Sequence, residues 1–259
     1  MTTTVDPPTA SFGTMLRDWR RRRRLSQLDL ALAAGVSARH VSFIETGRSA
    51  PSKAMVLRLG SVLDVPPRDQ NRLLVAAGLA PAFAERSLDA PDMAAVRAGV
   101  HRVLDAYDPY PCVVVDRGWW ILHANPGAAV LLDGVAAHLL RRPNALRIAL
   151  HPEGLAPRIR NLAQWRGHLL ERLRREVASS GSAELADLLA EIECYPGGSA
   201  HLPDLGGVAV PLELQTADGR ELRFLSMVTT FGTALDITAA ELSIEAFLPA
   251  DDATAAALR

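Results

Sequence analysis

The side chains of this chain best suited to chemistry at a surface lie in residues 37–47, SARHVSFIETG. If this stretch forms a short helix, Val41 and Ile44 share one face because they are three residues apart. The other side then carries an arginine, a histidine, a serine and a phenylalanine. A guanidinium can pair with the O6 and N7 acceptors of guanine, and an aromatic ring can touch a thymine methyl. An ordinary amphipathic helix with one stray aromatic is the alternative, and the neighbouring sequence decides between the two.

Residue types typical of catalysis do not form a recognisable motif. The seven histidines show neither HxxxH nor HxH spacing, and the chain contains no GxSxG, Walker or GxGxxG motif. The two cysteines lie in or beside apolar stretches without metal-ligand spacing, which predicts reduced, small hydrophobic residues. The sequence therefore favours a protein that is not an enzyme and has no cofactor or metal.

Charge is spread unevenly along the chain. Residues 1–79 hold 12 basic and 6 acidic side chains, whereas the remainder holds 16 and 23, so only the first part is expected to meet a polyanion. A length of 259 residues with 49% hydrophobic residues suits about two domains. The N-terminus lacks a leader pattern, and no apolar run reaches the roughly 18 residues of a membrane helix. We expect a cytoplasmic protein with no membrane partner.

Residues 12–78 predict five short helices separated by caps and stops. Ser26 with Asp29 three residues later is a capping signal, and Gly35 and Gly47 suit the left-handed ends of helices. The remaining start signals are Ser37, Ser52 and Pro67. Two helices of about eight residues joined by a short turn with glycine are typical of a helix-turn-helix.

Residues 15–65 carry the motifs LSQLDLA, GVS, FIETGRSAPS and LGSVLDV. Together they resemble the DNA-binding domain of phage-repressor-like (XRE-type) transcription regulators. The resemblance implies that double-stranded DNA is the partner and that the helix at 38–45 enters the major groove, which admits one helix.

The resemblance also implies a role for each matching residue. Arg39 is the main candidate for reading a base, and His40, Ser42 and Phe43 are lesser candidates. Arg20 and Glu45 match a partly buried salt bridge of the family and are expected to be structural. A solvated charged face is the alternative for the run at 20–24. The residues expected to contact the DNA backbone are Arg21, Arg22, Arg23, Arg24, Gln27, Ser37, Arg48 and Lys53.

The proline-containing stretch at 80–92 lacks the regular hydrophobic periodicity of a helix or strand. It therefore predicts a linker between a domain at 12–79 and one at 93–259. Residues 1–11 are expected to be a disordered tail. Beyond the linker, CVVVD and WWILHAN predict a hairpin around a two-residue RG turn, with a helix from about Pro126.

The rest of the second domain mixes strands and helices. Apolar side chains alternate along residues 208–214, which predicts a strand with one buried face. A turn at Asp218-Gly219 is followed by ELRFLSMVTTF, which predicts the next strand. Apolar stripes at 162–177 and 185–192 predict two amphipathic helices. These patterns favour an α+β domain with about four antiparallel strands and helices on one face.

Three stretches of this half resemble the ligand-binding half of MmyB-like transcription regulators over about residues 93–258. They are YPCVVVDRGWWILHANPGAAVLL, NALRIALHPEGLAPRIRNLAQWRGHLLERLRRE and FLSMVTTFGTALDITAAELSIEAFLPADDATAAAL. The resemblance implies a PAS-like fold that holds a small apolar ligand, such as a fatty acid, between sheet and helices. One departure is ECYPGGSAHLPDLGG at 193–207, which stands where many family members carry a Trp and a His.

We expect the ligand between the sheet and the helix around Trp165, since large apolar side chains gather on the two hairpins. The alternative is that these side chains only fill a core. Asn125, His151 and Thr229 are the polar candidates. The candidate ligand residues are Trp119, Ile121, Asn125, His151, Trp165, Leu169, Phe224, Met227, Thr229 and Phe231.

Because one helix-turn-helix reads only a few base pairs, we expect a homodimer on a two-fold symmetric operator. Two alternatives stay open for the C-terminal half: a domain used only for dimerisation or protein binding, and an unrecognised enzyme.

Overall fold

The protein is described by a computed structural model that covers residues 11–198, 209–232 and 234–259. The chain divides into two compact units, one formed by residues up to Glu85 with Leu235–Ile237, the other by Arg86–Ala234 with Thr238–Arg259. The predicted tail at 1–11 lies, apart from Ser11, outside the described residues. So does most of the stretch at 193–207, from residue 199 onward.

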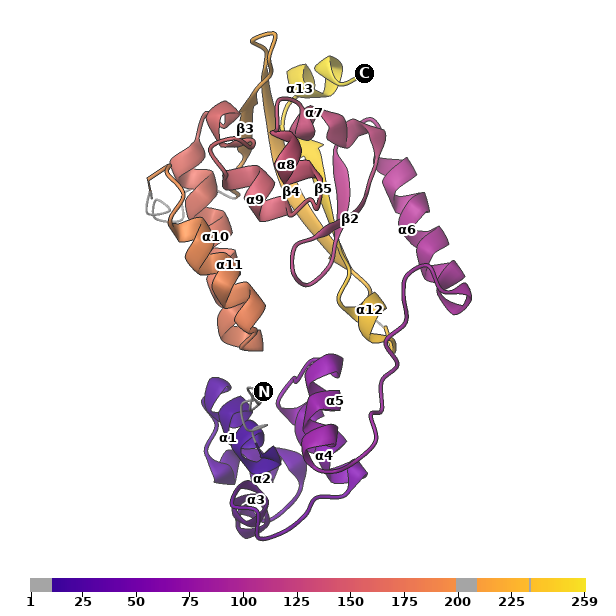
Figure 1. Ribbon diagram of the computed structural model, residues 1–259, viewed down its shortest axis with the longest axis vertical. Helices are drawn as coiled ribbons and strands as arrows, with labels where there is room; N and C mark the ends of the chain where they lie inside the picture. Colours follow the sequence, from indigo (N-terminus) through magenta and orange to yellow (C-terminus); the bar gives the residue numbers. More distant parts are fainter. Residues whose placement is uncertain (1–10, 199–208, 233) are drawn as a thin grey trace, which may run out of the picture. The chain divides into compact units, whose positions relative to one another are not determined.

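The first unit contains the five predicted helices (Figure 1). They are α1 (Phe12–Arg22), α2 (Gln27–Ala34), α3 (Ala38–Glu45), α4 (Lys53–Val62) and α5 (Pro67–Ala76). The predicted signals are confirmed: Ser26 and Asp29 form a reciprocal capping box, and Gly35 ends α2 at a φ of 63°. Ser37 and Ser52 accept hydrogen bonds from the first turns of α3 and α4.

The core of this unit is made of the apolar faces of all five helices, with Leu16, Leu30 and Ile44 almost fully buried. At one crossing α1 approaches α3 closely, because a Cβ on Gly13 would lie only 2.4 Å from the carbonyl oxygen of Glu45. Glycine at position 13 therefore fixes how near the first helix comes to the end of the third.

The second unit is built on a five-stranded antiparallel sheet in the order β2-β1-β5-β4-β3. The strands are β1 (Cys112–Val115), β2 (Ile121–Ala124), β3 (Leu212–Gln215), β4 (Glu221–Thr230) and β5 (Ser243–Pro249). The returning strand after Asp218-Gly219 is confirmed as β4. The strand predicted to start at residue 208 is shorter, since β3 begins at Leu212 and residue 208 lies outside the described part.

Helices cover both faces of the sheet, which corrects the prediction of a single covered face. Cys112, Val114 and Ile244 point to the face covered by α6 (Ala94–Tyr107). Their neighbours along the strands point to the opposite face, because side chains alternate along a strand. That face is covered by α7 (Ala129–Leu132), α8 (Ala137–Leu140), α9 (Ala145–Leu150), α10 (Leu162–Ser180) and α11 (Ala183–Glu193).

Two short helices complete the chain, α12 (Ile237–Ala240) and α13 (Asp252–Ala257). The apolar stripes predicted for the two long helices are confirmed, with Trp165, Leu169 and Leu173 buried on α10. On α11 the buried stripe is Leu185, Leu188 and Ile192.

The turn between β1 and β2 is longer than the predicted two residues and spans residues 116–120. Asp116 organises it, because its Oδ1 accepts hydrogen bonds from the backbone N–H of Gly118 (2.8 Å) and of Trp120 (3.0 Å). Trp119 adopts a left-handed φ of 65°. Both tryptophans therefore belong to the loop instead of the second strand.

Candidate DNA-binding surface and candidate ligand cavity

The third helix buries one face and presents a cationic, aromatic one. Val41 and Ile44 are buried, whereas Arg39 is exposed and Phe43 half-buried. The guanidinium of Arg39 lies 5.0 Å from the ring centroid of Phe43, and that of Arg48 lies 5.9 Å from the same ring. The ring attracts both cations through its π face, so Phe43 acts as a platform for two arginines at the helix surface.

Glu45, at the end of α3, is a buried charge in this unit's core, with only 4% of its surface exposed. Arg20 donates from Nε to Oε1 (2.7 Å) and from Nη2 to Oε2 (3.0 Å), which confirms the predicted salt bridge. Burial raises the pKa of Glu45, but hydrogen bonds from Arg20 and Gln27, with the charges of Arg20 and Arg17, outweigh burial and leave this pKa below its usual value. The carboxylate ties α1, α2 and α3 together.

Two of the predicted backbone-contact residues are engaged inside the protein. Gln27 Nε2 donates to Glu45 Oε2 at 2.8 Å, which links the start of α2 to α3. Arg23 donates from Nε to the carbonyl oxygen of Leu63 and from Nη2 to that of Asp64, both at 2.8 Å. Those are carbonyls at the end of α4, where a cation is favourable.

The other predicted residues lie on the surface of the helical unit. Arg21 and Arg24 are exposed at the end of α1, and the guanidinium of Arg22 lies 5.0 Å from the Trp19 ring. Ser37 Oγ accepts a hydrogen bond from the backbone N–H of His40 at 3.1 Å. Lys53 is exposed at the first position of α4.

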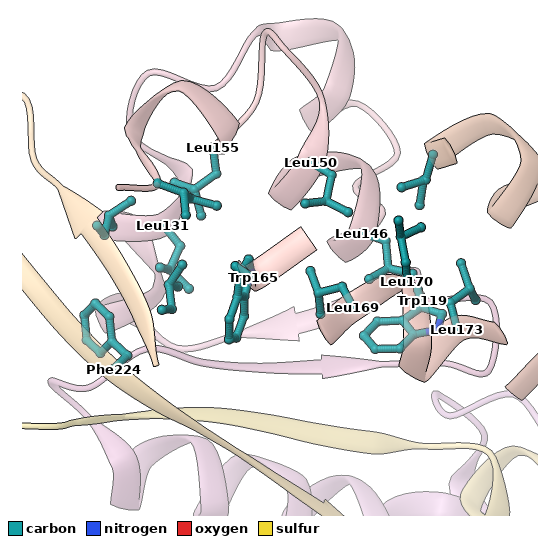
Figure 2. Packing of buried hydrophobic residues seen from close by; sticks show 14 of the residues in the cluster. Trp119, Leu131, Leu146, Leu150, Leu155, Trp165, Leu169, Leu170, Leu173 and Phe224 are labelled. Carbon is teal, nitrogen blue, oxygen red and sulfur yellow. The ribbon is translucent and has the colours of Figure 1, made fainter. Parts of the chain in front are cut away.

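The second unit contains a cavity of about 70 Å³ between the sheet and helices α7, α9 and α10. Most of its wall is apolar, and Figure 2 shows Trp165 of α10 between Leu131 on one side and Leu169 on the other. Four of the predicted ligand residues line it: Trp119, Ile121, Trp165 and Leu169.

Asn125 and His151 are not brought to this cavity. Asn125 is buried elsewhere, where Oδ1 accepts from the backbone N–H of Cys112 (2.9 Å) and Nδ2 donates to the carbonyl oxygen of Tyr110 (2.8 Å). It is a structural amide that holds the start of β1. His151 caps the end of α9, and its ring packs edge-on against Tyr195.

The predicted residues of β4 and the segment after it are also placed away from the cavity wall. Ser226 lines the cavity, so Met227 and Thr229 point to the opposite face, where Met227 is 39% exposed. Phe231 packs in the cluster on the α6 side. Phe224 shares the cavity's face of the sheet but is fully buried in the core, with its ring edge-on to Phe247.

The sequence reasoning missed the polar groups of the cavity wall. They are His168 and Arg172 on α10, Ser226 on β4 and Glu245 on β5. A signal was present, since Glu245 is the only charged residue of the otherwise largely apolar strand SIEAFLP. Its partner, Arg172 on α10, is 73 positions away in the sequence, so no local sequence pattern connects the two residues.

Arg172 is held on three sides. It donates from Nη2 to Glu245 Oε1 (2.7 Å), from Nη1 to Glu245 Oε2 (3.1 Å) and from Nε to Glu176 Oε1 (3.2 Å). Its guanidinium lies 4.3 Å from the Trp119 ring centroid, and the Trp119 indole N–H donates to Glu176 Oε2 at 2.8 Å. The arginine thus forms the centre of a network that connects α10, β5 and the β1–β2 loop.

Burial and nearby charges set the protonation of His168, which lies beside Arg172 in the cavity wall. Burial lowers the pKa of His168, and the charges of Arg172 and Arg175 lower it further. His168 is therefore neutral at neutral pH. Burial also disfavours the charged form of Arg172, but hydrogen bonds and charge from Glu245 and Glu176 outweigh it and raise the pKa of Arg172.

His138, His151 and Glu153 bring potential metal-ligand atoms within 4.8 Å of one another. However, His151 Nδ1 accepts a hydrogen bond from the backbone N–H of Glu153 at 3.0 Å, which places the hydrogen of a neutral ring on Nε2. A metal ion bound to Nδ1 would have to displace this hydrogen bond, and one bound to Nε2 would have to displace the hydrogen. We therefore assign no metal to this group. No helix in the described residues is long and apolar enough to span a bilayer.

Comparison with curated proteins finds relatives that are named as transcriptional regulators. The uncharacterized HTH-type transcriptional regulator RghRB of Bacillus subtilis is 39% identical over 82 residues, 31% of this chain and 57% of the relative. An uncharacterized HTH-type transcriptional regulator of Mycobacterium tuberculosis is 42% identical over 67 residues, 26% of each chain. The chain therefore matches only part of the length of these relatives.

Two solved structures are similar in part. The restriction-modification controller protein C.AhdI from Aeromonas hydrophila is 34% identical over 24% of this chain and 94% of its own, with a TM-score of 0.23. An RNA-binding light-oxygen-voltage receptor is 15% identical over 93% of this chain and 60% of its own, with a TM-score of 0.28. Both scores are low.

Family models cover most of the chain. A helix-turn-helix model matches residues 16–70, and the model of the MmyB-like transcription regulator ligand binding domain matches residues 96–259, more than half of the chain. The second of these models and the named relatives carry the names of transcription regulators. The chain carries a helix-turn-helix domain and belongs to the family defined by the MmyB-like transcription regulator ligand-binding domain.

Proposed function

We propose that this regulator senses an elongated amphiphile, with a fatty acid as the leading candidate, in the cavity between the sheet and α10. The observation that carries the proposal is the lining, in which 15 of 19 residues are apolar and the four polar ones lie on α10, β4 and β5. Small-molecule sites share this composition, because apolar walls supply affinity and a few polar groups supply orientation.

The cavity of about 70 Å³ holds only part of a long chain. The short helices α7 and α9 form one wall, and we expect them to move outward as a ligand enters, since short segments of this kind adjust more easily than the sheet. Apolar contact then grows with the length of the chain that is buried.

Titration calorimetry of the full-length protein with saturated fatty acids of eight to eighteen carbons tests the proposal. Each additional buried CH₂ should contribute up to about 0.8 kcal/mol until the cavity is full. A flat series, or no binding by any member, would favour a domain that serves only dimerisation or protein binding.

Strand β4 offers a matched pair of variants for the same titration. Ser226 faces the cavity and Thr229 is exposed on the other face of the strand. Ser226→Phe should fill the cavity and abolish binding, whereas Thr229→Phe should bind like the native protein. Equal affinities in the two variants would place the ligand elsewhere.

We also propose which residues of the helical unit read bases and which contact the DNA backbone. Arg39 reads a base, with His40, Ser42 and Phe43 as lesser contacts, and Phe43 orients the arginine. The proposed backbone contacts are Arg21, Arg22, Arg24, Ser37, Arg48 and Lys53. Gln27 and Arg23 serve the fold through the hydrogen bonds described above.

Binding-site selection separates these roles. Arg39→Ala should cost about 1–3 kcal/mol at one base position only, because a bidentate guanine contact is lost there. Arg21→Ala should weaken all sequences alike and lower the salt slope by about one unit. An unchanged site preference in Arg39→Ala would reject its assignment.

A homodimer on a two-fold symmetric operator is the assembly that we propose. Two recognition helices about 34 Å apart read two half-sites, and specificity rises accordingly. Light scattering and footprinting test this proposal. A monomer that protects a single half-site would refute it.

A further inference from the structure

Glu245 occupies an unusual position for a carboxylate. It lies in the middle of β5, which is hydrogen-bonded to β1 on one side and to β4 on the other, and its partners in register are Val113 and Val228. Its side chain is only 5% exposed and faces the apolar cavity. A buried ion pair gives little net stability compared with apolar residues of the same volume. Stability alone therefore does not account for this pair.

Arg172 has supports that do not depend on Glu245. Glu176 holds its Nε, and the face of Trp119 lies against its guanidinium. Glu245, in contrast, is bound through Arg172 alone among the hydrogen bonds and ion pairs described for it. If the Glu245 contact were broken, the guanidinium would stay in place with two N–H groups turned toward the cavity.

Arg172 is also the permanent cation among the described residues that line the cavity, since His168 is neutral. A planar guanidinium with two parallel N–H groups binds a carboxylate in a bidentate manner. Glu245 already uses that geometry, so it occupies the position that the carboxylate of an acidic ligand would take.

We propose that Arg172 is the anchor for the anionic head group of the ligand and that Glu245 is an internal carboxylate that occupies this anchor until the ligand displaces it. Ser226 and His168 line the same cavity and offer hydrogen-bond donors to the displaced Glu245. The inference rests on the proposed function and adds its head-group chemistry. It makes Glu245 a competitor that lowers the affinity for acids but not for neutral chains.

The test compares two probes of equal chain length, tetradecanoic acid and 1-tetradecanol, on the full-length protein at a pH where the free acid is ionised. The measured quantity is the ratio of the alcohol Kd to the acid Kd. Glu245→Gln keeps the side-chain shape and removes the competing charge, so this ratio should rise by about tenfold. Glu221→Gln, at an exposed position on β4, is the control and should leave the ratio unchanged.

Arg172→Gln alone would leave Glu245 buried without its partner and could fail to fold. The double variant Arg172→Gln/Glu245→Gln removes both charges together. It should bind 1-tetradecanol as the native protein does and lose its preference for the acid. Rescue by Arg172→Lys should be partial, because an ammonium cannot make the bidentate contact.

The outcomes separate the two proposals. If both probes bind the native protein but the ratio does not change in Glu245→Gln or in the double variant, the anchor assignment is overturned while ligand binding stands. If neither probe binds the native protein or the Glu245→Gln variant, both proposals fail.

Discussion

Each unit of the protein contains one buried glutamate paired with an arginine, and the two pairs have different surroundings. Glu45 accepts hydrogen bonds from Arg20 and Gln27 within a core that connects three helices. Glu245 is bound by Arg172 and faces a cavity. We infer that the same type of ion pair stabilises the fold in one unit and provides a carboxylate that a ligand can displace in the other. The difference between them is that Glu45 is surrounded by packed side chains, whereas Glu245 faces a cavity.

The largest effect is expected from breaking the pair that fixes the fold. Arg20→Met leaves Glu45 buried with weaker partners, and loss of one member of a buried pair costs about 3–5 kcal/mol. The helical unit should unfold at a much lower temperature while the second unit keeps its own transition, as followed by calorimetry. Arg58→Met, at an exposed position on α4, is the control. An unchanged first transition in Arg20→Met would show that Glu45 does not organise the core.

A smaller effect is expected when both members of the cavity pair are replaced. In Arg172→Met/Glu245→Leu the buried charges are exchanged for apolar atoms, and we expect stability to stay the same or rise by about 1 kcal/mol or more. Trp119 keeps its hydrogen bond to Glu176 in this variant. Calorimetry of the second transition measures the result. A large loss of stability would mean that this pair, like that of Glu45, is mainly structural.

The smallest effect concerns pH and the helical unit. The pKa of Glu45 is lower in the folded protein than its ordinary value of about 4.5. A lowered carboxyl pKa contributes stability that is complete above the unfolded pKa and is lost as pH falls through the folded one. The melting temperature of the helical unit should therefore fall steadily below about pH 4.5. Glu45→Gln should show a shallower decline, and an identical slope would contradict the prediction.

The two units also differ in how much of them could be predicted from the sequence. In the helical unit the signals are local, because Ser26, Ser37 and Gly35 each lie at the helix end that they determine. The role of Arg23 was not predictable in this way, because its acceptors, the carbonyl oxygens of Leu63 and Asp64, lie 40 and 41 residues further on.

In the second unit the apolar wall was partly predictable and the polar wall was not. The burial of Trp165 and Leu169 can be predicted from the helical periodicity of α10. The pairing of Arg172 with Glu245 cannot, because it forms only when β5 packs near α10 in the folded protein. Met227 and Thr229, two of the predicted ligand residues, lie on the face of β4 opposite Ser226, which lines the cavity. The register that decides which set faces the cavity is set by tertiary packing, which a single strand's pattern leaves open.

Native mass spectrometry of the full-length protein after incubation with tetradecanoic acid tests whether the cavity between the sheet and α10 binds a fatty acid. We expect one added ligand mass per chain in the native protein and in Thr229→Phe, and none in Ser226→Phe, because only the last variant fills the cavity. No added mass in the native protein, or the same added mass in both variants, would contradict it.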